Sequence, residues 1–149
     1  RLWHNLATSS LVQHLPGDQL KRLLSNMQLA HFAALEKLAA ENSPEAFLLL
    51  IVRGEVEVRA VAGNDGKEMT MRSFTSGDVL GEGVLLEHKS WPANYRVGEA
   101  PLTALRLTRE GLEQALQGNP DPRGFLEVLR EQHNDRDVTA ALRRLRTPR

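Results

Sequence analysis

The sequence predicts a mainly β domain: short strands form a jelly-roll-like, double-stranded β-helix barrel with an N-terminal helix and C-terminal helices. Three observations favour this fold class. Residues 47–52 form a continuous apolar run of strand length, and residues 56–61 alternate between apolar and charged side chains. A dense turn signal at residues 62–66, Ala-Gly-Asn-Asp-Gly, should join this second strand to residues 68–74 as a hairpin. Short strands broken by such turns are typical of double-sheet architectures.

Composition limits the function classes. A chain of 149 residues can form one domain with a proper core. Its 19 Lys and Arg residues balance 19 Asp and Glu residues, which is not the charge pattern of a nucleic-acid binder. Cysteine is absent, which excludes disulfides, thiolate metal sites and a Cys nucleophile and is consistent with the cytoplasm. No apolar run has the length of a membrane span. The chain starts at Arg1, and we expect a mature fragment or an excised domain.

The first part, residues 1–30, is predicted to be a helical lead-in to the barrel. Asp18 follows a Pro-Gly pair and is placed to cap the first turn of a helix. Apolar side chains then recur at the spacing of one helix face. They are Leu20, Leu23, Leu24 and Met27.

The barrel is expected to occupy residues 31–107, and helices are expected to occupy residues 108–149. Residues 94–97 alternate in character, and residues 101–107 give a final strand. Thr108 is a good cap for a helix over residues 109–116.

A further helix should start at residues 119–122, Asn-Pro-Asp-Pro, with Pro at its first position. An apolar stripe follows, interrupted by the polar residues 132–137; it comprises Phe125, Leu126, Leu129, Val138, Ala141, Leu142 and Leu145. The arginines after it are typical of a solvated helix end favoured by the helix dipole.

The stretch that carries functional information is residues 74–97. Gly81 and Gly83 bracket a single carboxylate, Glu82. Glycines accept positive φ and let the backbone approach a bound group, and successive N–H groups in such a turn can bind an anion. A lone carboxylate among these donors suits ligand hydroxyls. A tight turn with a surface Glu is the alternative.

This stretch resembles the phosphate-binding cassette of the cyclic nucleotide-binding domain family. The resemblance runs from residue 32 to residue 116 and includes Leu-Leu-Ile-Val-x-Gly-Glu-Val-Glu-Val at residues 49–58. It implies that Glu82 accepts ribose hydroxyls and that N–H groups near Val84 and Leu85 meet the phosphate of cyclic AMP or cyclic GMP. The predicted ligand site is Gly81, Glu82, Gly83, Val84, Leu85, Trp91, Pro92, Ala93 and Asn94.

One position departs from the family pattern. Where the family has its phosphate-binding Arg, this chain has Trp91 or, with a one-residue shift, Pro92. Neither can make the bidentate, charge-assisted contact of an Arg. Arg96 is the nearest cation, but the alternation that buries Tyr95 points Arg96 the other way. Trp91 could stack on a base, plug the pocket or cover apolar surface.

The family resemblance and local propensity disagree over residues 35–41. Ala, Leu, Glu and Lys favour a helix there, whereas the resemblance implies a strand, and we predict the strand. Leu35 and Asn42 stand where the family usually has Gly. Asn tolerates a left-handed turn, while Leu is expected to need another backbone geometry.

Catalytic and metal-binding motifs are absent from the sequence, so we predict that the chain is not an enzyme. The five histidines lack metal-ligand spacing, and there is no Gly-x-Ser-x-Gly elbow or P-loop.

Two functions remain. The first is a regulatory sensor module that binds a cyclic nucleotide or a related small ligand weakly and relays the binding through the C-terminal helices. The alternative is a degenerate, non-binding domain used for protein–protein interaction or dimerisation.

In the family, helices after the barrel carry the response and often pair subunits. The stripe between residues 125 and 145 could therefore contact a second copy or an effector domain, or pack back on the barrel. The DNA-binding part of the family's transcription-factor branch is missing from this chain.

Overall fold

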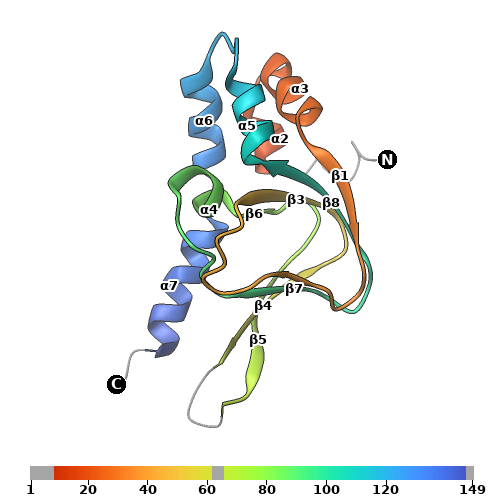
Figure 1. Ribbon diagram of the computed structural model, residues 1–149, viewed down its shortest axis with the longest axis vertical. Helices are drawn as coiled ribbons and strands as arrows, with labels where there is room; N and C mark the ends of the chain where they lie inside the picture. Colours follow the sequence, from red (N-terminus) through yellow and green to blue (C-terminus); the bar gives the residue numbers. More distant parts are fainter. Residues whose placement is uncertain (1–8, 62–65, 147–149) are drawn as a thin grey trace.

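Two four-stranded antiparallel sheets form a β-roll in the computed structural model, which describes residues 9–61 and 66–146 (Figure 1). The first sheet has the order β1-β8-β3-β6 and consists of β1 (Gln28–Phe32), β8 (Leu102–Thr108), β3 (Phe47–Arg53) and β6 (Val79–Leu80). The second has the order β2-β7-β4-β5 and consists of β2 (Lys37–Ala39), β7 (Asn94–Val97), β4 (Val56–Val61) and β5 (Glu68–Phe74). This architecture, with helices before and after it, confirms the predicted fold class.

Strand β3 is apolar from Phe47 to Val52 because both of its faces are buried there. Leu49 and Ile51 belong to the core between the two sheets. The alternate side chains belong to a second core, which lies between the first sheet and the helices; these are Leu48, Leu50 and Val52. A strand covered on both faces needs no polar alternation.

Strand β4 alternates because the second sheet is covered on one face only. Val56 and Val58 are fully buried between the sheets, while Glu57 and Arg59 between them are partly exposed. β4 pairs with β5 over residues 56–61 and 68–74, as the sequence predicts. The predicted turn that joins them falls on residues 62–65, which lie outside the described residues.

Four helices pack together beside the outer face of the first sheet (Figure 1). They are α2 (Ser10–His14), α3 (Gly17–Ser25), α5 (Arg109–Leu116) and α6 (Pro122–Arg130). The Thr108 hydroxyl accepts a hydrogen bond from Gly111 N–H at 3.1 Å, and Asp121 accepts one from Gly124 N–H at 3.0 Å. Both predicted helix starts are therefore confirmed.

Two local predictions are wrong. Helix α3 begins at Gly17 with Pro16 as its N-cap, so Asp18 is not the cap but lies in the first turn, where its charge favours the helix N-terminus. Leu35 was expected to avoid left-handed backbone, yet its φ is 65°. Its N–H donates to the Gly98 carbonyl at 3.0 Å, and this bond fixes the turn while the side chain stays exposed.

Helix α7 (Asn134–Arg146) lies along the side of the roll, below α4 (Glu82–Glu87) (Figure 1). Val138 and Leu142 of α7 are buried in the core between the sheets, together with Val84 and Trp91. The C-terminal stripe is thus turned largely toward the chain's own cores. Within the described ranges, every helix is too short or too polar to cross a membrane.

Candidate functional site

The predicted cassette is the segment that leaves β6, forms α4 and returns through a loop to β7. Gly81 starts it with a φ of 88°, a left-handed conformation that favours glycine. A Cβ at this position would collide with the Phe47 carbonyl and touch the Trp91 ring. Gly81 therefore allows β6 to pass close to β3 before α4 begins.

Glu82 is fully buried, and both of its carboxyl oxygens are occupied by the chain itself. Gly83 N–H donates to Oε2 at 2.8 Å. The N–H of Asp135, in the first turn of α7, donates to Oε1 at 3.2 Å. The carboxyl group thus joins α4 to the start of α7.

Asp135 extends this junction to the second sheet. It is 5% exposed, and its Oδ1 accepts a hydrogen bond from the Tyr95 hydroxyl at 3.1 Å. Beside it, the Asn134 amide donates to the Val79 carbonyl at 2.8 Å. The first turn of α7 is therefore bonded to β6, α4 and β7 at once.

The buried carboxyls perturb each other's ionisation. Burial, followed by the charge of Asp135 and a hydrogen bond to its carboxylate, raises the pKa of Glu82 to about 9. Burial also raises the pKa of Asp135 and that of Tyr95. At neutral pH Glu82 therefore carries a proton.

Trp91 fills the interior of the roll next to this pair. It is 1% exposed, and its ring centroid lies 4.9 Å from that of Phe47 and 5.1 Å from that of Tyr95. Its Nε1–H donates to the Glu45 carbonyl at 2.8 Å. The side chain is thus held by two rings and one hydrogen bond.

The other predicted site residues lie in the same region but differ in exposure. Val84, Leu85 and Ala93 are buried, and the Leu85 N–H donates to the Gly81 carbonyl at 2.9 Å. The Asn94 side chain accepts from the Glu41 N–H at 2.8 Å. The structure therefore brings the nine residues together around α4 and the following loop.

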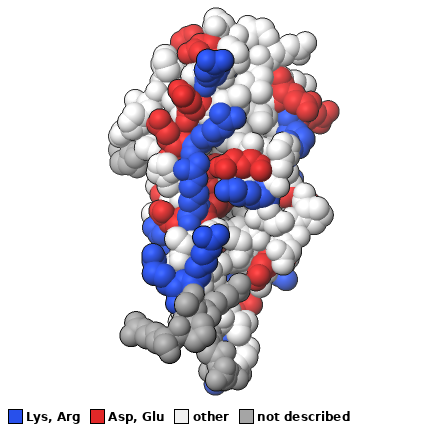
Figure 2. Space-filling view, turned by 90° about the vertical axis from the view of Figure 1, so that its left-hand side faces the viewer, with Lys and Arg blue, Asp and Glu red and all other residues white. Residues whose placement is uncertain are grey.

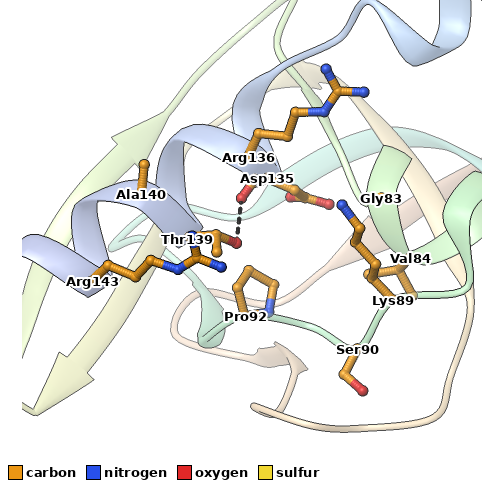
Figure 3. Close-up of a pocket in the computed structure, with 10 residues that line it drawn as sticks. All are labelled: Gly83, Val84, Lys89, Ser90, Pro92, Asp135, Arg136, Thr139, Ala140 and Arg143. Carbon is orange, nitrogen blue, oxygen red and sulfur yellow. Dashed lines mark hydrogen bonds between the residues drawn. The ribbon is translucent and has the colours of Figure 1, made fainter.

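The positively charged side chains beside the cassette come from α7 and from the loop after α4, not from β7. Arg96 pairs with Glu57 at 2.6 Å on the other side of its strand, as the alternation predicts. Lys89 lies in the loop after α4, and Arg136 and Arg143 lie on α7 (Figure 3). Together they line a cavity of about 320 Å³, with Gly83, Val84, Ser90, Pro92, Asp135, Thr139 and Ala140.

Among residues 9–61 and 66–146, no group of three or more His, Asp or Glu side chains could hold a metal ion. The candidate features of the described chain are the buried carboxyl pair, the buried rings and the cation-lined cavity.

The family model of the cyclic nucleotide-binding domain matches residues 29–119, which span the roll, the cassette and α5. The chain belongs to this family. The predicted resemblance is thereby confirmed.

Known proteins resemble this cyclic nucleotide-binding domain in sequence or in fold at low sequence identity. Human cGMP-dependent protein kinase 2 is 21% identical over 123 residues, which cover 82% of this chain but only 16% of the kinase. A cyclic nucleotide-binding domain from Methylobacillus flagellatus is 24% identical, covers 88% of this chain and 72% of its own, and has a TM-score of 0.70.

The regulatory subunit of a cAMP-independent protein kinase A from Trypanosoma brucei has the same TM-score of 0.70. It is 18% identical and covers 96% of this chain and 50% of its own. At such identities these structures establish the fold.

The sequence analysis missed Asp135 as a partner of Glu82 in this cyclic nucleotide-binding domain. The two residues are 53 positions apart, and Asp135 lies in the polar stretch that was interpreted as a break in the apolar stripe. One signal could have identified it: an acidic residue at the start of a helix. The next turns of that helix carry the apolar Val138 and Leu142.

Proposed function

We propose that this cyclic nucleotide-binding domain is a regulatory module whose own helix α7, rather than a cyclic nucleotide, occupies the nucleotide pocket. In this proposal the regulated quantity is the docking of α7. Cyclic AMP or cyclic GMP binds weakly, because it must displace the helix first.

The pairing of Glu82 carries this proposal. The family resemblance assigns this residue to ribose hydroxyls, but one carboxyl oxygen accepts the N–H of Asp135 and the other that of Gly83. The next turns of α7 bury Val138 and Leu142 in the roll. A ribose would need both the acceptor and the space that α7 uses.

Trp91 supports the same conclusion. It stands where the family resemblance puts an Arg, and its indole is packed between Phe47 and Tyr95. Losing a hydrogen bond to a charged group costs about 1.5–3 kcal/mol, which weakens binding by about 10- to 150-fold. The similarity of fold to the regulatory subunit of a protein kinase A described as cAMP-independent is consistent with control by other means.

Weak nucleotide binding and helix docking are linked in this proposal. If α7 is docked in most molecules, the apparent dissociation constant of a nucleotide rises in proportion to the ratio of docked to undocked molecules. By linkage, a bound nucleotide would shift the docking equilibrium of α7 toward the released state by the same factor. The domain would then relay binding through its last helix.

The test is titration calorimetry with cyclic AMP and cyclic GMP on the parent chain and on Val138→Asp, which places a charge on the buried face of α7. We expect parent binding weaker than about 1 mM. Releasing the helix should improve affinity at least about tenfold. The matched control is Leu145→Asp, the same kind of change at a side chain that is 43% exposed.

Two further variants separate the helix from the missing Arg. In the Val138→Asp background, Trp91→Arg should tighten binding by about tenfold or more, and Glu82→Ala should remove it. Micromolar cyclic nucleotide binding by the parent would contradict the proposal. So would a folded Val138→Asp/Trp91→Arg chain that binds no cyclic nucleotide.

A further inference from the structure

Two carboxyl groups meet inside the protein at the junction of α4 and α7. Glu82 belongs to α4 and is fully buried, and Asp135 belongs to the first turn of α7 and is 5% exposed. Figure 3 shows the Asp135 side chain directed from α7 toward α4. Since the two groups come from different helices, release of α7 from the roll would return both carboxyls to water. Their burial therefore depends on the docking of α7.

The burial of this pair is not compensated by a salt bridge. The ion pairs between described side chains include neither Glu82 nor Asp135. Transfer of an ionised carboxyl group from water to the protein interior is unfavourable without a close cation, and two like charges in contact add to the cost. At least one proton must therefore stay on the pair while α7 is docked.

The hydrogen bonds of the pair lead to the same conclusion. Asp135 Oδ1 accepts the Tyr95 hydroxyl, whereas Oδ2 is buried and has no partner of ordinary geometry among the described residues. A protonated Glu82 supplies an O–H donor for the neighbouring carboxylate, and an ionised Glu82 supplies none. A buried acceptor without a donor destabilises the state that buries it. The pKa of Glu82, raised by burial and by Asp135 to about 9, agrees with this requirement.

Among the described residues, the elements packed around the pair contribute one further buried ionisable group. The Tyr95 hydroxyl faces Asp135 from β7, and burial raises the pKa of Tyr95, so it keeps its proton. Strands β3 and β6 and helix α6 present apolar side chains around α4. Lys89 of the loop after α4 and Arg136 and Arg143 of α7 line the cavity beside Asp135.

Other charges near the pair lie at or close to the surface. Arg72 of β5 pairs with Asp137 of α7 at 3.9 Å. Glu87 of α4 pairs with Arg136 at 3.2 Å, and His133, just before α7, is exposed. Figure 2 shows this face, where Lys and Arg side chains form a band with Asp and Glu side chains between them. Salt screens such exposed charges much more than it screens a buried pair, so the two effects can be told apart.

We propose that a proton on this carboxyl pair holds α7 on the roll, so that the domain responds to pH through the docking of α7. The docked state keeps the proton, whereas a released Glu82 has its ordinary pKa of 4.5 and loses the proton above it. Docking is therefore strongest in acid, and it weakens about tenfold for each unit of pH rise per proton. The dependence ends near pH 9, where the docked Glu82 ionises as well.

This proposal rests on the proposed function, in which the docking of α7 is the regulated quantity, and it names the proton as what regulates that docking. A cyclic nucleotide has to displace α7 before it binds. Its affinity should therefore rise with pH over the same range, by up to about tenfold per pH unit.

The experiment measures docking against pH with spin labels on Ser73→Cys in β5 and Arg144→Cys in α7, which are both exposed. Leu142→Ala removes a buried apolar contact of α7 without a change of charge, and it should bring the released helix to a measurable population. In this background we expect the ratio of released to docked molecules to rise about tenfold per unit between about pH 6 and about pH 8. At roughly 0.5 M salt the slope should remain.

Two further variants assign the slope to the buried pair. In the Leu142→Ala background, Glu82→Gln should remove the pH dependence, because the amide has no proton to lose and can still donate to Asp135. The matched control is Glu87→Gln, the same change at the other end of α4, where the side chain is 28% exposed. This variant should keep the slope. Carboxyl ¹³C NMR of the parent chain adds a readout that does not depend on released helix, and it should show Glu82 in its acid form at neutral pH.

Three results would overturn the proposal. One is a slope that survives Glu82→Gln, because it would come from another group such as His133. Another is a ratio of released to docked molecules that does not change with pH in the Leu142→Ala chain. The third is an ionised Glu82 at neutral pH in the parent.

The distance distribution of the parent in mild acid, at about pH 6, separates this proposal from the proposed function. If the distribution is narrow and the Leu142→Ala chain shows no pH dependence, the proton linkage alone is wrong. If the distribution is broad, α7 is not docked, and the proposed function fails together with the linkage.

Discussion

At the scale of single residues, the buried pair of Glu82 and Asp135 couples folding to pH. The folded chain keeps the Glu82 proton up to about pH 9, whereas an ordinary Glu loses it near 4.5. Between these values the folded state binds more protons than the unfolded state. The free energy of unfolding therefore falls as pH rises, by up to about 1.4 kcal/mol per pH unit for one proton. The raised pKa of Asp135 acts in the same direction.

We predict that Glu82→Gln flattens this dependence. The amide has no proton to lose, yet it can still donate to Asp135 and accept an N–H. Urea denaturation of the parent should give a free energy of unfolding that decreases between about pH 5 and about pH 9, and the variant should show a clearly smaller decrease. Equal slopes in the two proteins would mean that Glu82 is ionised in the folded state.

Predictions from the sequence were least complete for the contacts of single residues. The sequence identified Glu82 and Trp91 as the unusual positions, because both stand in a recognisable motif. It could not assign Asp135 to Glu82, since contact between residues 53 positions apart depends on where α7 docks. Whether Trp91 faced a ligand or the core was equally open, and the rings of Phe47 and Tyr95 decide it in this structure.

At the scale of elements, the start of α4 depends on one glycine. We predict that Gly81→Ala lowers the free energy of unfolding more than Gly66→Ala does. Both glycines have positive φ, 88° and 71°, so each substitution carries a backbone cost of about 1–2 kcal/mol. Only at Gly81 would the added Cβ also meet Phe47 and Trp91, which adds about 1–3 kcal/mol.

The measurement is again urea denaturation, with Gly66→Ala as the matched control. Equal losses of stability in the two variants would show that β6 and β3 can move apart without a loss of stability. The position of α4 would then not depend on Gly81.

Strand boundaries could be predicted where the chemistry is local. Alternation gives β4, the turn signal after it gives β5, and the Thr108 cap gives the start of α5. β2 is different, because its residues favour a helix and only its pairing with β7 makes it a strand. Leu35 likewise takes left-handed backbone because Gly98 bonds its N–H. Such cases need the neighbouring strand, which local propensity does not contain.

At the scale of the whole molecule, α7 joins the C-terminal stripe to the cassette, two regions that lie apart in the sequence. Its buried face completes the core between the sheets, and its first turn bonds to α4, β6 and β7. Its exposed face carries the cations of the cavity. A change at either face therefore alters one equilibrium, the docking of α7.

This equilibrium can be measured directly, because the chain has no cysteine. Spin labels on Ser73→Cys in β5 and Arg144→Cys in α7, both exposed, report the distance between the roll and the helix. We predict one narrow distance distribution for the otherwise unchanged chain and for Leu145→Asp. Val138→Asp should give a broad one, because a carboxylate in the apolar core costs several kcal/mol and the helix must leave. A broad distribution in the otherwise unchanged chain would contradict the proposed closure. A narrow one in a folded Val138→Asp chain would mean that the bonds of Asn134 and Asp135 hold α7 without its apolar face.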